Sequence, residues 1–202
     1  MTQRPFHHGN LRAVLLDEAA AVVRESGVDG LSLRDLARRA GVSHGAPRSH
    51  FVHRQALLDA LAEVGFERLT ADVRRALDGG GGLRERFRRV ARAYVDFAVD
   101  DAALMDLMFQ TKTTDEPGTV REAAATLFAT LDAAVGPAVP EGATDESREL
   151  FKMLFAATMQ GIAALVASGR IERPAGDRLV DAAMDTMLDS ELGRRAVTAR
   201  SA

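Results

Sequence analysis

The sequence predicts an all-α protein of about nine helices. Apolar residues recur at intervals of three and four along most of the 202 residues, which is the period of a helix with one buried face. No segment shows the sustained two-residue alternation of a half-buried strand. The composition is rich in alanine, leucine and arginine, which are good helix formers, and a chain of this length can bury a sizeable core.

Two helices are expected before residue 41. The first covers residues 11–26 and ends at Gly27, because glycine tolerates the left-handed backbone that commonly follows a helix. The second covers residues 33–40. Ser32 can cap its N-terminus, and Gly41 ends it.

A short helix is expected over residues 44–50, with Ser43 as its cap, and a long helix over residues 54–77. The four glycines at 79–82 cannot continue a helix and are the most evident candidate for a domain boundary. Five further segments have helical periodicity and complete the fold: 83–99, 102–109, 120–135, 145–168 and 177–192.

Charge is distributed unevenly between two predicted domains. The N-terminal domain, residues 1–55, has a formal charge of +3, and the C-terminal domain, residues 56–202, has −6. The helix over 54–77 connects the two. A basic segment of this kind fits a polyanionic partner such as nucleic acid. Five arginines between residues 84 and 92 are interpreted as solvent-exposed surface, the alternative being that one or two of them face DNA or an anionic ligand.

The composition argues against an enzyme and against metal or cofactor chemistry. There is no cysteine, which excludes disulfides and thiolate ligands. All five histidines precede residue 54, so the rest of the chain has no imidazole base to activate a nucleophile. His44 and His50 would lie on different faces of a helix and make a poor pair of metal ligands. We therefore expect no catalytic residue, no cofactor and no metal.

The protein is expected to be cytoplasmic. Its first residues lack the apolar run of a signal peptide. The longest apolar stretch, residues 153–167, contains Gln160 and is too short to span a bilayer. We therefore expect no membrane partner.

Residues 33–51 have the pattern of a helix-turn-helix. Ala37 supplies the small residue that lets the two helices cross, and Gly41 supplies the turn. In this motif the second helix enters the major groove of DNA with its first residues at the base edges. Gly45 allows the backbone to come close to the duplex, and Arg48 can contact a guanine or a phosphate.

Ten residues are candidates for contact with DNA. Ser32 and Arg54 begin the flanking helices, where backbone N–H groups and the helix dipole favour a phosphate. Both are therefore expected to fix the position of the protein rather than to recognise sequence. The ten residues are Ser32, Arg34, Ser43, His44, Gly45, Ala46, Pro47, Arg48, His50 and Arg54.

These motifs resemble the tetracycline-repressor (TetR) family of bacterial regulators. The matching segments are residues 8–11, 30–37, 40–43 and 50–51, followed by Arg54 and Leu57-Leu58. The family's lysine after the His-Phe pair corresponds to Arg54, and its tyrosine, which touches the DNA backbone, corresponds to Arg48. Residues 91–109 also resemble the regulatory domain of members with a Trp…His-Gly signature, although residues 155–161 lack that Trp and His.

The resemblance implies a transcriptional regulator that binds a palindromic operator as a homodimer, and that acts as a repressor released by a small, apolar effector. It also implies an effector cavity in the C-terminal domain. The candidate lining residues are Phe87, Tyr94, Phe97, Met105, Met108, Phe109, Phe128, Phe155 and Met159. Without the resemblance, methionine and aromatic side chains at this spacing are more typical of an ordinary core, which is the alternative interpretation.

The last two helices are candidates for the dimer interface. The helix over 145–168 is apolar on more than one face, and two helices from each protomer would form a four-helix bundle around a two-fold axis. The candidate residues are Leu154, Thr158, Ile162, Leu165, Val180, Met184, Met187 and Leu188. An effector that tilts the helix over 54–77 would change the spacing of the two recognition helices. The alternative is an all-α protein-binding module without DNA activity.

Overall fold

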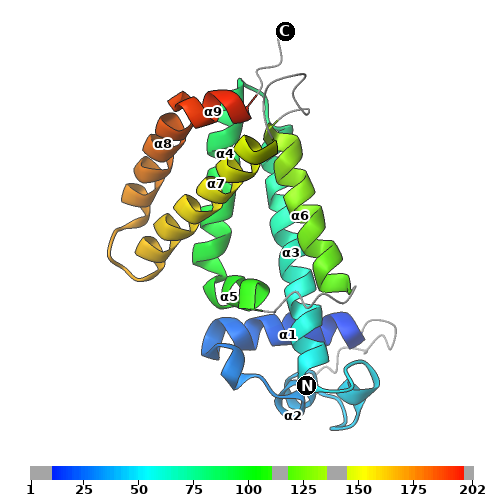
Figure 1. The fold of residues 1–202 in the computed structure, drawn as a ribbon. Coiled ribbons are helices and arrows are strands. Elements are labelled where there is room, and N and C mark those ends of the chain that lie inside the picture. Colours follow the sequence, from blue (N-terminus) through cyan, green and yellow to red (C-terminus); the bar gives the residue numbers. More distant parts are fainter. Residues whose placement is uncertain (1–10, 111–117, 136–144, 198–202) are drawn as a thin grey trace. The chain divides into compact units, whose positions relative to one another are not determined.

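The computed structural model of the protein describes residues 11–110, 118–135 and 145–197 (Figure 1). Within these ranges the chain forms nine α-helices and two short 3-10 helices, and no strand, which confirms the predicted fold class. Contacts divide the chain into two compact units. The N-terminal unit comprises Met1–Gly65 and Ala103–Val120, and the C-terminal unit comprises Phe66–Ala102 and Arg121–Ala202.

The chain first passes from one unit to the other inside a helix. The passage lies between Gly65 and Phe66, within α3 (Arg54–Asp78). It coincides neither with the boundary that the sequence suggests at residue 55 nor with the glycines at 79–82. Those glycines instead separate α3 from the next helix, because they follow its last residue.

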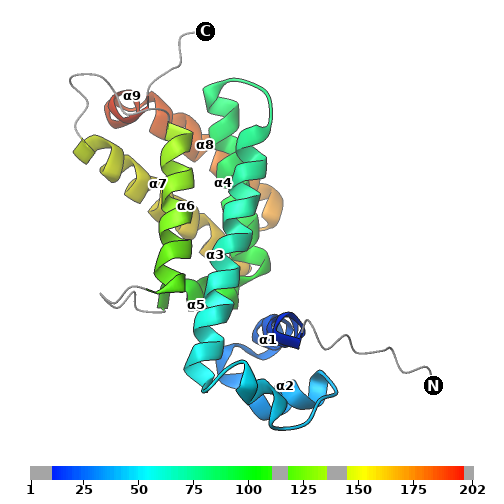
Figure 2. The same cartoon turned by 90° about the vertical axis from the view of Figure 1, so that its right-hand side faces the viewer.

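The N-terminal unit is built from short helices that pack on the first part of α3 (Figure 2). Its elements are α1 (Leu11–Ser26), η1 (Val28–Gly30), α2 (Leu33–Arg39), η2 (Ala46–Ser49), the start of α3, and most of α5 (Ala102–Gln110). Helix α5 lies close to α3 at Gly65, where an added Cβ would be 2.6 Å from the sulfur of Met108. Core side chains that are at most 5% exposed include Leu15, Val23, Leu31, Leu36, Ala37, Phe51, Leu57 and Leu61.

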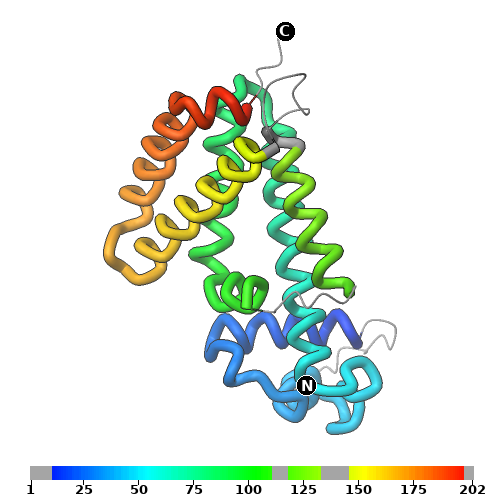
Figure 3. Tube along the Cα trace, in the orientation of Figure 1, coloured from blue at the N-terminus to red at the C-terminus, as the bar shows by residue number. Residues whose placement is uncertain are grey.

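The C-terminal unit is centred on α4 (Leu83–Asp100), which packs against α7 (Asp145–Ala167) and α8 (Arg173–Asp189) (Figure 3). Its further elements are the second part of α3, most of α6 (Thr119–Val135) and α9 (Glu191–Ala196). Two edge-to-face aromatic pairs join α4 to α7. The ring centroids of Phe87 and Phe151 are 5.9 Å apart, and those of Tyr94 and Phe155 are 6.4 Å apart.

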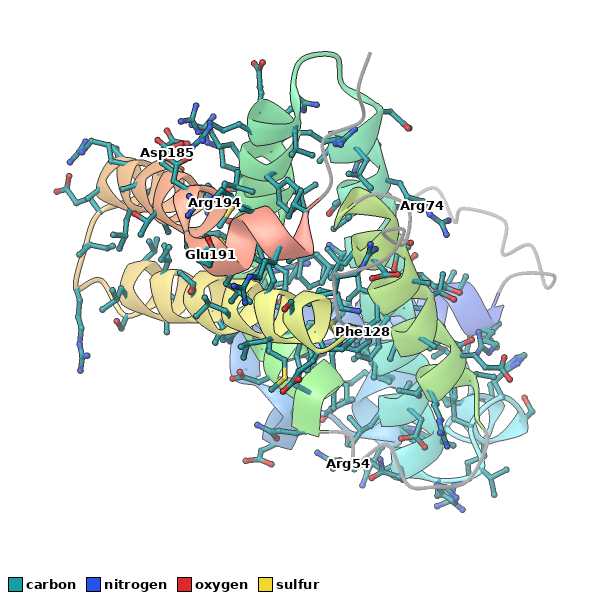
Figure 4. The ribbon with its side chains drawn as sticks, turned by 45° about the horizontal axis from the view of Figure 1, so that its top comes forward. Arg54, Arg74, Phe128, Asp185, Glu191 and Arg194 are labelled. Carbon is teal, nitrogen blue, oxygen red and sulfur yellow. The ribbon has the colours of Figure 1, made fainter. Side chains whose placement is uncertain are left out.

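Three of the five arginines in the basic run of α4, which the sequence indicates as solvent-exposed surface, form ion pairs with α8. Arginines spaced by four residues on α4 meet aspartates spaced by four on α8, as Figure 4 illustrates at the labelled Asp185. Arg88 donates to both carboxylate oxygens of Asp185, at 2.6 and 2.8 Å. The other pairs join Arg84 to Asp185 and Asp189, and both Arg88 and Arg92 to Asp181. The two helices are therefore held together by charge as well as by apolar packing.

The prediction of one final helix over 177–192 is wrong at both ends. Helix α8 begins at Arg173, because Pro174 fits the first turn of a helix, where its missing N–H costs little. A second helix, α9, begins after Ser190, whose hydroxyl accepts the Gly193 N–H at 2.9 Å. The sequence therefore contains one more α-helix at this end than its periodicity indicates.

One described segment, Glu146–Ala167 of α7, is long and apolar enough to cross a membrane by length and composition, with a mean hydropathy of 1.7 and 28% of its span buried. This segment begins seven residues before the stretch 153–167, which the sequence indicates as the longest apolar stretch. Packed helices of water-soluble proteins pass the same test, so this is weak evidence for a membrane span.

Candidate DNA-binding site

The first half of the helix-turn-helix forms as the sequence predicts. The Asp35 N–H donates to the Ser32 hydroxyl at 3.1 Å, so Ser32 caps α2. The Ser32 hydroxyl in turn donates to the Asp35 carboxylate, which lowers the pKa of Asp35 together with the contact from Arg38. Gly41 has a φ of 67°, the left-handed conformation that the turn after α2 requires. Ala37 is fully buried where α2 meets its neighbours.

The second half differs from the prediction. The prediction of a helix over 44–50, capped by Ser43, is wrong, because the described backbone forms only the 3-10 turn η2, which begins after Gly45. The Arg48 N–H donates to the Gly45 carbonyl at 3.1 Å and the His50 N–H to the Pro47 carbonyl at 3.1 Å, which is the 3-10 pattern. A glycine and a proline among seven residues disfavour a longer α-helix.

Most of the predicted contact residues on this segment are exposed. Ser43, His44, Gly45, Arg48 and His50 are all exposed, and Ala46 is half-buried. Pro47 is buried and packs inside the unit, so it supports the turn rather than offering a surface to DNA. The turn therefore presents one cation and two imidazoles to solvent within seven residues.

The arginines of the N-terminal unit divide into partnered and unpartnered groups. Arg38 pairs with Asp35, and Arg39 pairs with Glu25 at 2.8 Å, a hydrogen bond that lowers the pKa of Glu25. Arg34 and Arg48 are exposed and have no partner among the described residues. These two side chains are free to neutralise phosphates or to contact bases.

Arg54, a predicted phosphate contact, is engaged within the unit. Its Nε donates to the carbonyl of Leu31 at 3.1 Å, and its Nη2 donates to the carbonyl of Val28 at 2.5 Å. Ser32, the other predicted contact at a helix start, is half-buried and serves as the cap of α2. The structure therefore gives both residues a role inside the unit.

Sequence reasoning missed three features near the turn. The His53 Nδ1 accepts the Ala56 N–H at 3.0 Å and so caps the start of α3, a role for which histidine gives little sequence signal. Arg12 of α1 lies over the Phe51 ring, 5.7 Å from its centroid. Val52, between Phe51 and His53, is 80% exposed, an unusual position for a valine.

The predicted effector residues are distributed over both units. Phe87, Tyr94, Phe97, Phe155 and Met159 are buried in the C-terminal unit, and Met105 and Met108 are buried in the N-terminal unit. Phe109 and the labelled Phe128 (Figure 4) are 52% and 50% exposed. A cavity of about 320 Å³ in the C-terminal unit includes Phe97 but is otherwise mostly charged, with Arg68, Asp72, Arg75, Ala93, Asp96, Asp100 and Asp101 as its remaining lining.

The predicted interface residues also divide by burial. Ile162, Val180, Met184 and Met187 are buried and belong to the core of the protomer itself. Of the other four, Leu154 is 42% exposed, and Thr158, Leu165 and Leu188 are half-buried. Three further apolar residues of these two helices, Leu150, Met153 and Leu179, are exposed.

Taken together, a capped helix, a glycine turn and an exposed basic 3-10 turn define a helix-turn-helix protein. Residues 15–61 match the family model of bacterial regulatory proteins of the tetR family, and residues 87–190 match the tetracyclin repressor-like C-terminal domain. The chain belongs to the TetR family of bacterial transcriptional regulators, whose members are not enzymes. The predicted resemblance to the TetR family is thus confirmed.

Individual relatives agree with this assignment. A solved protein of unknown function from Rhodococcus sp. RHA1 is 41% identical, with a TM-score of 0.77 over 92% of this chain and 97% of that one. The class A tetracycline repressor protein from transposon 1721 of Escherichia coli is 44% identical over 40% of this chain and 39% of its own length. The HTH-type transcriptional activator FasR of Mycolicibacterium smegmatis is 30% identical over 52% of this chain and 48% of its own. The chain thus matches less than half the length of these two curated relatives.

Proposed function

We propose that this protein is a transcriptional regulator that binds a palindromic operator as a homodimer, and that releases it when a small, apolar effector binds. The observation that carries the proposal is the pair Arg34 and Arg48, exposed on the two elements of the helix-turn-helix and without a partner among the described residues. An arginine held out to solvent beside a close-approaching glycine backbone is suited to phosphates and guanine edges.

Selection from random duplexes, followed by binding measured against salt, tests the DNA activity. We expect a two-fold symmetric consensus and an affinity that falls steeply as salt rises, because each phosphate contact releases counterions. Arg48→Gln should reduce the slope of log K against log salt by about 0.9. Arg74→Gln, which removes an exposed charge from α3 in the C-terminal unit, is the matched control (Figure 4). Failure to enrich any duplex would favour a helical protein-binding module instead.

An apolar stripe on α7 supports the homodimer. Leu150, Met153 and Leu154 are 54%, 68% and 42% exposed, and they lie on one face of the helix by their spacing of three and four. The exposed small residues Ala157 and Gly161 continue this face and allow another helix to come close. Large exposed apolar patches are costly unless a partner covers them, so a second copy of the chain suits this stripe.

Light scattering on purified protein tests the dimer. Met153→Glu inserts a charge into the stripe and should yield monomers with operator affinity reduced by at least an order of magnitude, since two half-sites would no longer be bound together. Ala71→Glu, an equal charge change at an exposed site of α3, should leave the dimer intact. A wild-type protein that is monomeric at all concentrations would contradict the proposal.

Effector binding is the third part of the proposal. In the interior of the C-terminal unit, aromatic rings of α4 and α7 pack in two pairs, one of which contains Tyr94. Because Tyr94 is the only tyrosine and there is no tryptophan, its fluorescence reports on that interior. We expect small apolar compounds that change this fluorescence to release the operator as well. A reporter gene placed behind the selected operator then separates repression from activation.

A further inference from the structure

The hydrogen bonds of Arg54 suggest a role different from the phosphate contact that sequence predicts for it. Arg54 is the first residue of α3, and Figure 4 labels it there. Its Nε and Nη2 both donate to backbone carbonyls, those of Leu31 and Val28. These two nitrogens form one edge of the planar guanidinium, and this is an edge with which arginine grips a phosphate. That edge is occupied by the protein's own backbone.

The two carbonyls belong to the segment that sets the start of α2. Val28 begins the 3-10 turn η1, and Leu31 immediately precedes Ser32, the cap of α2. Leu31 is itself only 2% exposed, so its position is fixed by the core. Arg54 therefore ties the beginning of α3, the helix after the recognition turn, to the beginning of α2, the helix before it.

Electrostatics at the helix start favours the same interpretation. A cation in the first turn of a helix is unfavourable, because the N-terminus of the helix dipole is positive. The carbonyl oxygens of Val28 and Leu31 offset that repulsion by accepting from the guanidinium. Arg34 and Arg48, by contrast, have no partner among the described residues and are available to the duplex.

We propose that Arg54 is a positioning residue, which fixes the orientation of α2 and η2 for DNA by clamping the connector before α2 onto the start of α3. The proposal rests on the DNA binding proposed above. It predicts that operator binding requires the two parallel N–H donors of the guanidinium, Nε and Nη2, and not its charge. Lysine keeps the charge and would still reach a phosphate, but an ammonium cannot hold two carbonyls in the same planar geometry.

The test compares Arg54→Lys, Arg54→Gln and Arg48→Gln, each measured well below its melting temperature and shown to be folded by circular dichroism. Under the proposal, Arg54→Lys weakens operator binding by about tenfold or more, because the duplex must then order the segment that the clamp holds in the free protein. The slope of log K against log salt stays at the wild-type value in both Arg54 variants. Arg48→Gln lowers that slope by about 0.9. Retained affinity in Arg54→Lys together with a reduced slope in Arg54→Gln would identify a phosphate contact and overturn the proposal.

Amide hydrogen exchange separates this proposal from the DNA activity. The Leu31 N–H donates to the Val28 carbonyl of η1, and the Leu36 N–H donates to the Ser32 carbonyl in the first turn of α2. Loss of the clamp should speed exchange of these two amides in both Arg54 variants and not in Arg48→Gln. If the wild type binds no duplex but this exchange pattern appears, the proposed function fails while the clamp stands. If the duplex binds and exchange is unchanged in Arg54→Lys and Arg54→Gln, the clamp is refuted alone.

Discussion

Tyr94 provides a direct spectroscopic test of how the C-terminal unit is packed. Its side chain is 4% exposed, its hydroxyl donates to Gln160 Oε1 at 3.2 Å, and its ring meets that of Phe155 edge to face. Burial disfavours the charged phenolate and raises the pKa of Tyr94 from its ordinary value of 10.0 to about 12. Because the chain has one tyrosine and no tryptophan, no other residue contributes a phenolate signal.

The raised pKa has a defined effect on stability. The folded state holds the Tyr94 proton more tightly than the unfolded state does, so stability falls as pH rises. The contribution is fully present below pH 10 and is lost as pH rises through about 12. A tenfold difference in proton affinity between the folded and unfolded states is worth about 1.4 kcal/mol. The loss of stability is therefore about 1.4 kcal/mol near pH 11 and approaches about 2.7 kcal/mol above the folded-state pKa.

The assay is a near-ultraviolet titration of phenolate absorbance with circular dichroism recorded in parallel. We expect the folded protein to ionise about two pH units later than the protein in concentrated urea. Tyr94→Phe should abolish the absorbance change and the part of the alkaline destabilisation assigned to this residue. Ionisation near pH 10 with the helical signal intact would refute the assignment of Tyr94 to a water-excluded interior.

Three further predictions concern stability. Gly41→Ala should lower the free energy of unfolding by about 1–2 kcal/mol in urea, because Gly41 has a φ of 67°. Gly193→Ala should cost about 1–3 kcal/mol, since its Cβ would lie 2.1 Å from the Met187 carbonyl oxygen, whereas Gly80→Ala, with open space at its Cβ, should not destabilise. Hydrogen bonds from Arg84, then Arg88, lower the pKa of Asp185, so its stabilising contribution holds above the ordinary carboxyl pKa and is lost on acidification. Asp185→Asn should therefore flatten the acid side of a urea-midpoint profile.

Sequence patterns predicted the long helices well because their ends carry explicit signals. The helix over 11–26 has the same bounds in the structure, where Gly27 adopts a φ of 70°. The helix over 54–77 is one residue longer in the structure, and the glycines that follow it do end it. Where a stop residue is present and apolar periodicity is sustained, local chemistry and tertiary packing agree.

The failures occurred where a residue type has two roles. Pro174 precedes the helix that periodicity predicts, as in a connector, but proline is equally at home in the first turn of a helix. Ser190 lies within unbroken apolar periodicity, which hides its role as the cap of α9. Apolar periodicity also could not separate residues buried in the protomer, such as Met184, from exposed residues, such as Met153, because the residues of both groups are apolar.

The candidate site shows a similar limit for charge. The sequence identified the arginines of the helix-turn-helix. It could not show which guanidinium groups are hydrogen-bonded within the protein, since their partners are distant in the chain. Arg39 reaches Glu25, 14 residues away, and Arg54 reaches Val28, 26 residues away. A salt bridge or carbonyl contact already formed in the free protein must be broken before the same atoms can bind a phosphate, so such arginines contribute less to DNA affinity than their charge implies. Arg34 and Arg48 have no such contact to break among the described residues, so we expect each of them to contribute more to DNA affinity than Arg39 or Arg54 does.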